Sequence, residues 1–97
     1  MSERPRGKRK TLKHHRRALH LAGKRNAIGE RVRTLRKKAG LTQDNLAAKC
    51  ALLGWNIDRQ IVAHIEGGLR EVSDLELCVF CHVFAISPND LTGWPRR

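Results

Sequence analysis

The chemistry that stands out first lies within six residues and combines a guanidinium, a carboxamide, a methyl and an imidazole group. These groups belong to Arg59, Gln60, Ala63 and His64. Arginine can donate two parallel hydrogen bonds to guanine O6 and N7, and glutamine can pair with adenine N6 and N7. Alanine can contact a thymine methyl group, and histidine can donate to a purine acceptor or a phosphate. The set can therefore read bases, although an ordinary solvated helix surface has the same composition.

A second set of residues superficially matches a catalytic metal site. His64-x-Glu66 followed by Cys78-x-x-Cys81 has the order of a zinc deaminase signature. Only twelve positions separate Glu66 from Cys78, the proline before the cysteine pair is missing, and no strand pattern supplies a pocket. A structural zinc needs four ligands, and no second pair stands at suitable spacing. We therefore expect both cysteines to be small buried apolar residues, and we expect no enzymatic activity, metal or cofactor.

A helix must carry the four base-reading candidates if they are to share one face. Asp58 is a natural N-cap for it, and Ile61, Val62 and Ile65 form an apolar stripe at helical spacing. When that stripe faces a core, the opposite arc contains the four candidates. We predict a helix that begins near Asp58, with a buried underside and an outer face open to a ligand.

Two amphipathic helices are predicted before this one. The first has an apolar stripe at i, i+4, i+7 and i+11, formed by Ile28, Val32, Leu35 and Ala39. Asn26 is its expected cap and Gly40 its stop. The second has its stripe at i, i+4 and i+7, formed by Leu46, Cys50 and Leu53. The Thr42 hydroxyl caps its start by accepting from a first-turn amide, and Gly54 ends it.

Two further helices are predicted after it. Ser73-Asp74-Leu75-Glu76 is a capping box, and the apolar stripe that follows consists of Leu77, Phe80, Cys81 and Phe84. Ser87-Pro88-Asn89-Asp90 starts a short helical turn, with Leu91 and Trp94 available to cover the core. The longer helix also has apolar residues on its other side, Val79 and Val83, so the last helix or a second subunit must cover it. The predicted fold class is all-α, with five short helices.

The positive charge is concentrated at the N-terminus. The 97 residues include 20 Lys and Arg against 9 Asp and Glu, for a formal net charge of +11. Residues 1–26 hold ten bases and one acid, net +9, whereas residues 27–97 hold ten bases and eight acids, net +2. We therefore predict a basic arm over 1–26 and one compact domain over 27–97. This charge favours a polyanionic partner, with nucleic acid ahead of a membrane surface.

The arm is predicted to be largely disordered. Through about Lys10 it has too little apolar surface to offset the entropy of ordering. Residues 11–22 can form a helix only if a phosphate backbone neutralises their like charges. A solubilising tail and a targeting peptide are the alternatives to a phosphate-binding arm. No apolar run approaches the ~20 residues of a membrane helix. Three cysteines fit a reducing interior, so we expect a cytoplasmic protein without membrane contact.

Several short motifs follow one another between about Ala27 and Leu91. They are Gly40-Leu41-Thr42-Gln43, Leu46-Ala47, Ile57-Asp58-Arg59, Val62, Ile65-Glu66-Gly67-Gly68, Arg70 and Ser73. In this order they resemble the Cro and phage-repressor family, also called XRE, whose members have a lambda-repressor-like helix-turn-helix domain. The most specific parts are the Leu-Thr-Gln entry to the second helix and the Ile-Glu-x-Gly-x-Arg exit from the third.

The resemblance implies roles for individual residues. It places the base-reading positions at Arg59, Gln60, Ala63 and His64. It places contacts to the DNA backbone at Thr42, Gln43, Gly68 and Arg70, and we add Lys38 on the outer side of the first helix. Glu66 is implied to be structural, pinning helix ends rather than meeting DNA.

The spacing departs from the family pattern in one place. Gln43 and Glu66 are 23 positions apart, about five more than the family pattern has. We assign the insertion to about one extra turn at the end of the second helix, through Leu52 and Leu53. A longer turn then follows, in which Trp55 fills a gap beneath the helices.

The expected function is sequence-specific binding of double-stranded DNA and regulation of transcription, usually by blocking polymerase, with the protein on the nucleoid while bound. If it forms a homodimer, half-sites should lie about one helical turn, ~34 Å, apart. Three alternatives stay open at this stage. They are an antitoxin that adds a toxin-binding surface, an RNA-binding or ribosome-associated protein driven by the basic arm, and a protein-interaction adaptor.

Overall fold

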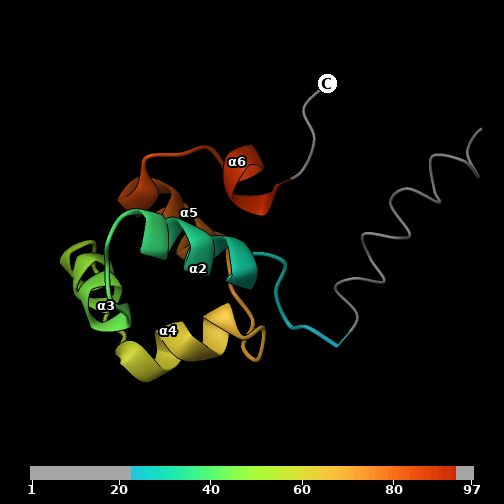
Figure 1. Ribbon diagram of the computed structural model, residues 1–97, viewed down its shortest axis with the longest axis horizontal. Coiled ribbons are helices and arrows are strands. Elements are labelled where there is room, and N and C mark those ends of the chain that lie inside the picture. The colour runs from blue at the N-terminus through green and yellow to red at the C-terminus, as the bar shows by residue number, and fades with distance from the viewer. Residues whose placement is uncertain (1–22, 94–97) are drawn as a thin grey trace, which may run out of the picture.

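The computed structural model describes residues 23–93, and this part of the chain contains five helices and no strand (Figure 1). The helices are α2 (Gly29–Lys38), α3 (Gln43–Leu52), α4 (Arg59–Glu66), α5 (Asp74–Phe84) and α6 (Pro88–Thr92). The all-α prediction is confirmed. The predictions for residues 1–22 and for Trp94 lie outside the described residues. No helix within 23–93 has the length and apolar character needed to cross a membrane.

Side-chain caps begin four of the helices, as the sequence predicts. The Asn45 amide donates to Thr42 Oγ1 at 3.0 Å, and the Ile61 amide donates to Asp58 Oδ1 at 3.0 Å. Before α5, Ser73 and Glu76 close the predicted capping box from both sides. Ser87 caps α6 through the Asp90 amide at 3.2 Å. These contacts satisfy first-turn amides that the helix itself leaves unpaired.

The start of α2 differs in detail from the prediction. Ile28 occupies the N-cap position, and its side chain makes no capping hydrogen bond. Asn26, two residues earlier, supplies the missing acceptor because its Oδ1 receives the amides of Ile28 at 3.0 Å and Gly29 at 2.7 Å. The predicted capping role of Asn26 is thus performed from outside the helix.

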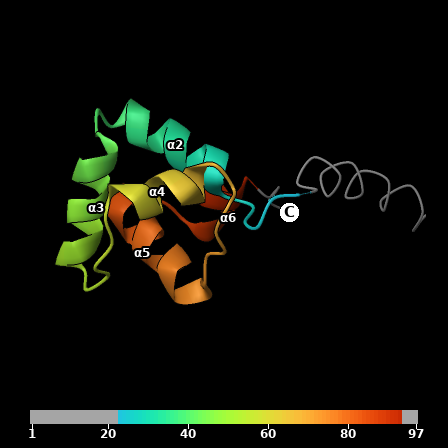
Figure 2. The same ribbon diagram turned by 90° about the horizontal axis from the view of Figure 1, so that it is seen from below.

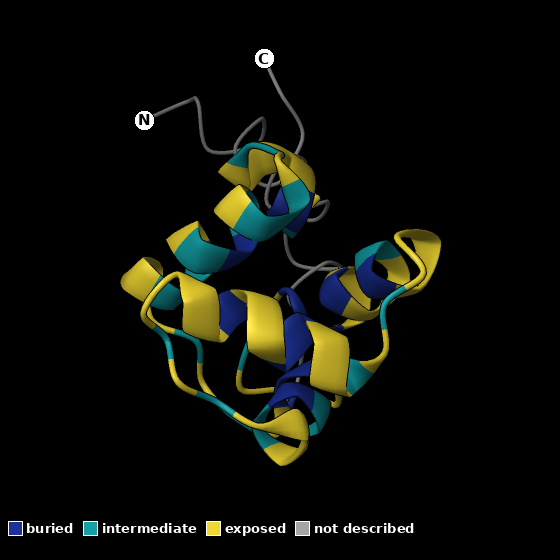
Figure 3. Cartoon of the chain, turned by 90° about the vertical axis from the view of Figure 1, so that its left-hand side faces the viewer, coloured by how far each residue is buried: buried dark blue, intermediate teal, exposed yellow. Residues whose placement is uncertain are grey.

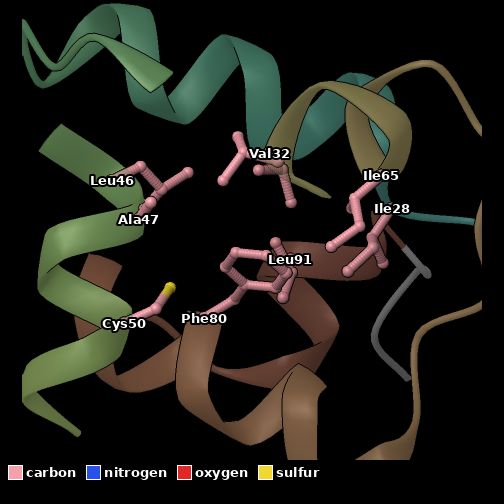
Figure 4. Packing of buried hydrophobic residues seen from close by; sticks show 9 residues of the cluster. Ile28, Val32, Leu46, Ala47, Cys50, Ile65, Phe80 and Leu91 are labelled. Atoms are coloured by element: carbon pink, nitrogen blue, oxygen red, sulfur yellow. The ribbon is translucent and has the colours of Figure 1, made fainter. Parts of the chain in front are cut away.

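The helices pack around one apolar core with Phe80 at its centre (Figure 4). Both α2 and α3 contact α4, α3 also contacts α5, and α6 packs on α5 and α2 (Figures 1 and 2). The buried apolar residues lie on the inward sides of the helices (Figure 3) and are Ile28, Val32, Leu46, Ala47, Cys50, Val62, Ile65, Phe80 and Leu91. This core holds α4 from behind and leaves its other side open.

Two residues of the predicted stripes lie outside the core. Ala39 is exposed because α2 ends at Lys38 and the chain turns away at once. Leu53 is 43% exposed because α3 ends at Leu52 and Leu53 occupies the C-cap. Each predicted stripe therefore runs one residue past the end of its helix, into the C-cap position.

The prediction that Cys78 and Cys81 are both buried is wrong. Cys78 is exposed and Cys81 is half-buried, whereas Cys50 is fully buried. The reason is that Cys78 lies on the exposed side of α5 with Leu75 and His82, whereas Cys81 packs partly against the core. Burial raises the pKa of the Cys50 thiol to about 11, as expected for a thiol whose charged form is disfavoured by its apolar surroundings.

The longer connection between α3 and α4 is accommodated at the α5 side of the molecule. Trp55 is half-buried, and its ring meets Phe80 edge to face with 5.2 Å between centroids. The Arg70 guanidinium lies 5.8 Å from the Trp55 ring centroid. The predicted gap-filling role of Trp55 is therefore confirmed, and the extra residues leave the packing of α3 on α4 intact.

Candidate nucleic-acid interface

Helix α4 separates a fully buried side from an open polar side. Val62 and Ile65 have no exposed surface, because they point into the core between α2, α3 and α5. Arg59, Gln60 and His64 are exposed. Within residues 23–93, none of these three side chains makes a hydrogen bond or an ion pair. The groups that match nucleotide edges are thus presented together, without partners in the part of the chain that the structure describes.

Ala63, the fourth predicted base-reading residue, is half-buried. It lies on the same helix one turn after Arg59 and Gln60, so its methyl group is set back from the longer side chains. Such a position suits a close apolar contact after the longer side chains have engaged. The structure therefore brings all four predicted residues together on α4.

A buried ionic network holds the C-terminal end of α4. The Arg36 Nε donates to Glu66 Oε2 at 2.6 Å and its Nη2 donates to Oε1 at 3.1 Å, while only 10% of the Arg36 side chain and 4% of the Glu66 side chain are exposed. The Gln43 Nε2 donates to the same Oε1 at 3.1 Å, and the Arg36 Nη1 donates to the Leu41 carbonyl at 2.9 Å. The network joins the end of α2, the start of α3 and the end of α4, so α4 cannot rotate without breaking it.

Glu66 therefore has the structural role that the resemblance implied, and the 23-residue separation does not prevent Gln43 from reaching it. Arg36 was missed in the sequence analysis. It lies four residues after Val32, at the edge of the apolar stripe of α2, where an arginine is normally expected to face solvent. Only the acid on another helix makes that burial favourable.

Thr42, Gln43 and Lys38 lie close together where α2 gives way to α3. Thr42 is exposed, and because its Oγ1 accepts from the Asn45 amide, its O–H remains available as a donor. Gln43 is half-buried with its amide nitrogen on Glu66. Lys38 is exposed at the last residue of α2. Of these three residues, Gln43 is the one whose side chain contacts the C-terminal end of α4, through Glu66.

Gly68 and Arg70 are engaged within the protein. Gly68 is buried with φ +74°, and its N–H donates to the Ile65 carbonyl at 3.0 Å. The Arg70 guanidinium binds both carboxylate oxygens of Glu76, at 3.0 and 3.1 Å. This pairing raises the pKa of Arg70 and lowers the pKa of Glu76. A phosphate contact by either residue has to compete with these internal partners.

The segment before α2 contributes residues that the sequence analysis assigned to the arm. The Arg25 N–H donates to the Gly68 carbonyl at 2.8 Å, and the Asn26 Nδ2 donates to the Ile65 and Arg70 carbonyls at 3.0 and 2.8 Å. The contacts with the domain therefore begin before the predicted boundary at residue 27. The segment lies beside the turn that follows α4 (Figures 1 and 2).

Comparison with known proteins gives one informative similarity. No protein-family model matches the chain, and no relative was found among curated protein sequences. Among solved structures, the chain is similar to the restriction-modification controller protein C.AhdI from Aeromonas hydrophila, with 33% sequence identity and a TM-score of 0.57. The similarity covers 66% of this chain and 86% of that one. It therefore extends over most of that protein, in sequence as well as in fold.

Proposed function

The chain belongs to the Cro and phage-repressor (XRE) family of helix-turn-helix proteins, and from this premise we propose that it binds double-stranded DNA sequence-specifically and regulates transcription. The observation that carries the proposal is the contrast between the two sides of α4. Its underside is fully buried at Val62 and Ile65. Its outer side presents Arg59, Gln60 and His64, whose side chains have no hydrogen-bond or ion-pair partner within residues 23–93. A major groove admits one α-helix, and it is there that base pairs differ in their donor and acceptor pattern.

In the proposed complex, the first two turns of α4 read bases. Arg59 donates to a guanine, Gln60 pairs with an adenine, and Ala63 contacts a thymine methyl group. His64 donates to a purine acceptor or a phosphate. The Asp58 cap and the Glu66–Arg36 network hold the two ends of the helix, so little further ordering is needed when it enters the groove.

The proposed contacts to the DNA backbone come mainly from the α2–α3 turn. Lys38 supplies a charge, and Thr42 and Gln43 supply polar groups at the start of α3. The internal partners of Gly68 and Arg70 make them weaker members of this set. Phosphate contacts fix the register of the protein on the duplex but carry no sequence information, so their loss should weaken binding to every sequence alike.

We also propose that the protein acts as a homodimer through the outer side of α5. Leu75 is 76% exposed, Cys78 is exposed, and Val79 is half-buried one turn after Leu75. A second copy of the same helix would cover this apolar surface on both chains. Two reading helices would then meet half-sites about one helical turn apart, ~34 Å.

The regulatory role that the similarity favours is that of a controller protein, because the similar solved structure is one from a restriction-modification system. On a promoter, the bound protein would act as a repressor by excluding polymerase. This similarity favours a cytoplasmic regulator over an enzyme, and it gives no support to an antitoxin or an RNA-binding protein.

The decisive test of base reading compares the DNA-sequence preferences of variants as well as their affinities. A cognate site is first selected from a random duplex pool with the full chain. Arg59→Ala and Gln60→Ala should each lose about 1–3 kcal/mol on this site and should relax the preference at one base pair each.

Lys38→Ala is the matched comparison, because it removes a charge outside α4. It should weaken binding to the cognate and to unrelated duplexes by the same factor. The slope of the logarithm of the binding constant against the logarithm of the salt concentration should become shallower by ~0.9, the value for one lost phosphate contact. If Arg59→Ala behaves as Lys38→Ala does, with equal losses on all duplexes, α4 does not read bases.

A further inference from the structure

Four exposed residues form a line along the outer side of α5 and its C-cap. Leu75, Cys78, His82 and Ala85 follow one another at intervals of three, four and three residues, and all are exposed. We call these four residues the seam. Such alternation keeps side chains in one line along a helix, and it is the spacing by which one helix packs along another. The helix that bears the seam lies at the edge of the molecule opposite α2 (Figure 2).

The seam is symmetric about the level of residue 80. Leu75 and Ala85 each lie five positions from this level, and Cys78 and His82 each lie two positions from it. In an antiparallel pair of helices with a twofold axis at this level, each residue meets the one at the same distance on the other side of the axis. Leu75 then packs over Ala85 of the second copy, and Cys78 lies opposite His82 of the second copy. A large side chain faces a small one, so the two helices can approach closely.

Cys78 and His82 are both of a residue type that binds metals, and they lie one helical turn apart. Side chains at i and i+4 are neighbours on a helix, and two ligands at this spacing can bind one zinc ion. Both residues are exposed. Within residues 23–93, neither side chain makes a hydrogen bond or an ion pair. The middle of the seam therefore presents two ligand groups that are available for binding.

One copy of the chain offers only this pair of ligands. Among the residues that the structure describes in a single copy, no group of three or more His, Cys, Asp or Glu side chains could hold a metal ion. Cys81 adds no third ligand because it packs against the core, and its burial, followed by the charge of the nearby Cys78, raises its pKa. A structural zinc needs four ligands, and a twofold axis between Cys78 and His82 supplies them as two identical pairs.

We propose that the seams of two copies form a Cys₂His₂ site for one zinc ion, with Cys78 and His82 of each copy as ligands, and that this ion stabilises the homodimer. Thiolate and imidazole are the usual ligands of structural zinc. The two thiols pass their protons to solvent on binding, and the two thiolates balance the charge of Zn²⁺. The inference rests on the proposed function, because it takes the homodimer to form through α5. It adds that the pairing of the two reading helices depends on a metal.

Sedimentation equilibrium of the full chain with and without zinc tests this site. A chelator first removes metal, and a phosphine keeps the cysteines reduced so that no disulfide joins two copies. Zinc chloride is then the only addition. At a free zinc concentration about 100 times the dissociation constant of the site, the dimer dissociation constant should fall about 100-fold. The dimer should contain one zinc ion for two chains.

Cys78→Ser and Cys81→Ser are a matched pair, because each removes one thiol from α5. Cys78→Ser should abolish the effect of zinc and leave the zinc-free dimer dissociation constant within about twofold of the wild-type value. Cys81→Ser should keep the full effect of zinc, and His82→Gln should lose it. The histidines of residues 1–22 are unchanged in all these variants, so any zinc that they bind is common to every protein compared.

Cobalt(II) in place of zinc gives a readout that depends on sulfur. Tetrahedral Co²⁺ with thiolate ligands absorbs visible light strongly, whereas Co²⁺ in water does not. The absorption should reach its full intensity at one Co²⁺ for two chains, and it should be retained in Cys81→Ser and lost in Cys78→Ser.

The outcomes separate this inference from the proposed homodimer. A dimer whose dissociation constant is the same with and without zinc overturns the inference alone, as does an equal effect of zinc on the wild-type protein and on Cys78→Ser. Binding of one zinc ion by a monomer through Cys78 also overturns it. A wild-type protein that stays monomeric with and without zinc overturns both the inference and the homodimer, and leaves base reading by α4 to its own test.

Discussion

Helices α4 and α5 contact the same core but present opposite chemistry to solvent. In α4, the outward residues are an arginine, a glutamine and a histidine, and the inward residues Val62 and Ile65 are completely buried. In α5, only Phe80 is completely buried, and Leu75, at 76% exposure, faces solvent. Both helices start at a capping side chain, so they differ in the side chains that each exposes to solvent.

The two uncovered surfaces fit different kinds of partner. A polar surface can exchange water for the donors and acceptors of a groove with little change in hydrophobic burial. An apolar surface gains ~25 cal/mol for each Å² removed from water, so another apolar surface suits it best. The comparison therefore supports the proposal that α4 meets DNA and that α5 meets a second copy of the chain.

The largest expected effect comes from breaking the anchor of α4. Glu66→Ala leaves the Arg36 guanidinium buried without its carboxylate, and losing one partner of such a pair costs about 3–5 kcal/mol in the free energy of unfolding. Urea denaturation of both proteins measures the difference.

Glu71→Ala is the control for this anchor, because its ion pair with Arg25 is long and largely exposed. It should leave the urea midpoint unchanged within error. Equal midpoints for the wild-type protein and Glu66→Ala would show that the network does not hold α4.

The next largest effect is on dimerisation through α5, with little change in the stability of the monomer. Leu75→Ala removes apolar surface that the proposed homodimer buries, so the dimer dissociation constant should rise about tenfold, equivalent to ~1.4 kcal/mol. Sedimentation equilibrium measures it. The free energy of unfolding of the monomer should change by less than about 0.5 kcal/mol. If the wild-type protein and Leu75→Ala are both monomeric at all concentrations, the proposed homodimer through α5 is wrong.

The smallest effect is a pH dependence at the start of α5. Hydrogen bonds from Arg70, followed by those from Ser73, lower the pKa of Glu76 despite its partial burial. Since the folded pKa is below the unfolded value of about 4.3, the contribution to stability is present above that pH and is lost as pH falls through the folded value.

Urea unfolding of the wild-type protein and of Glu76→Gln at pH 7, 4 and 3 checks this dependence. The stability difference between the two should be largest at pH 7 and should shrink toward pH 3. A difference that stays constant over this range would mean that the Glu76 charge does not contribute.

The elements were predictable from the sequence because their signals are local. Thr42, Asp58 and Ser73 cap amides three residues ahead of them, and apolar spacing identifies the face of α4 that enters the core. Propensity and spacing within one turn decide such features before any tertiary contact forms. The outward face of α4 followed from the same spacing.

The contacts that were not predicted join residues far apart in the chain. Arg36 is buried because Glu66, 30 positions later, neutralises it, and Asn26 binds carbonyls 39 and 44 positions away. Arg70 is paired with Glu76 across the turn before α5. No single-helix pattern contains the partner in these cases. The family resemblance therefore placed Arg70 at a phosphate, and residue type left Arg36 on the surface.

The most direct measurement of the central claim is photochemical cross-linking from the major groove. Thymines of the selected duplex are replaced one at a time by 5-bromouracil, whose bromine occupies the position of the thymine methyl group in that groove. The cross-linked peptides are then identified by mass spectrometry after trypsin digestion. Cross-links within residues 59–64 of α4 are the predicted result. Cross-links confined to α5, or to the chain before residue 27, would contradict the assignment of α4 as the reading helix.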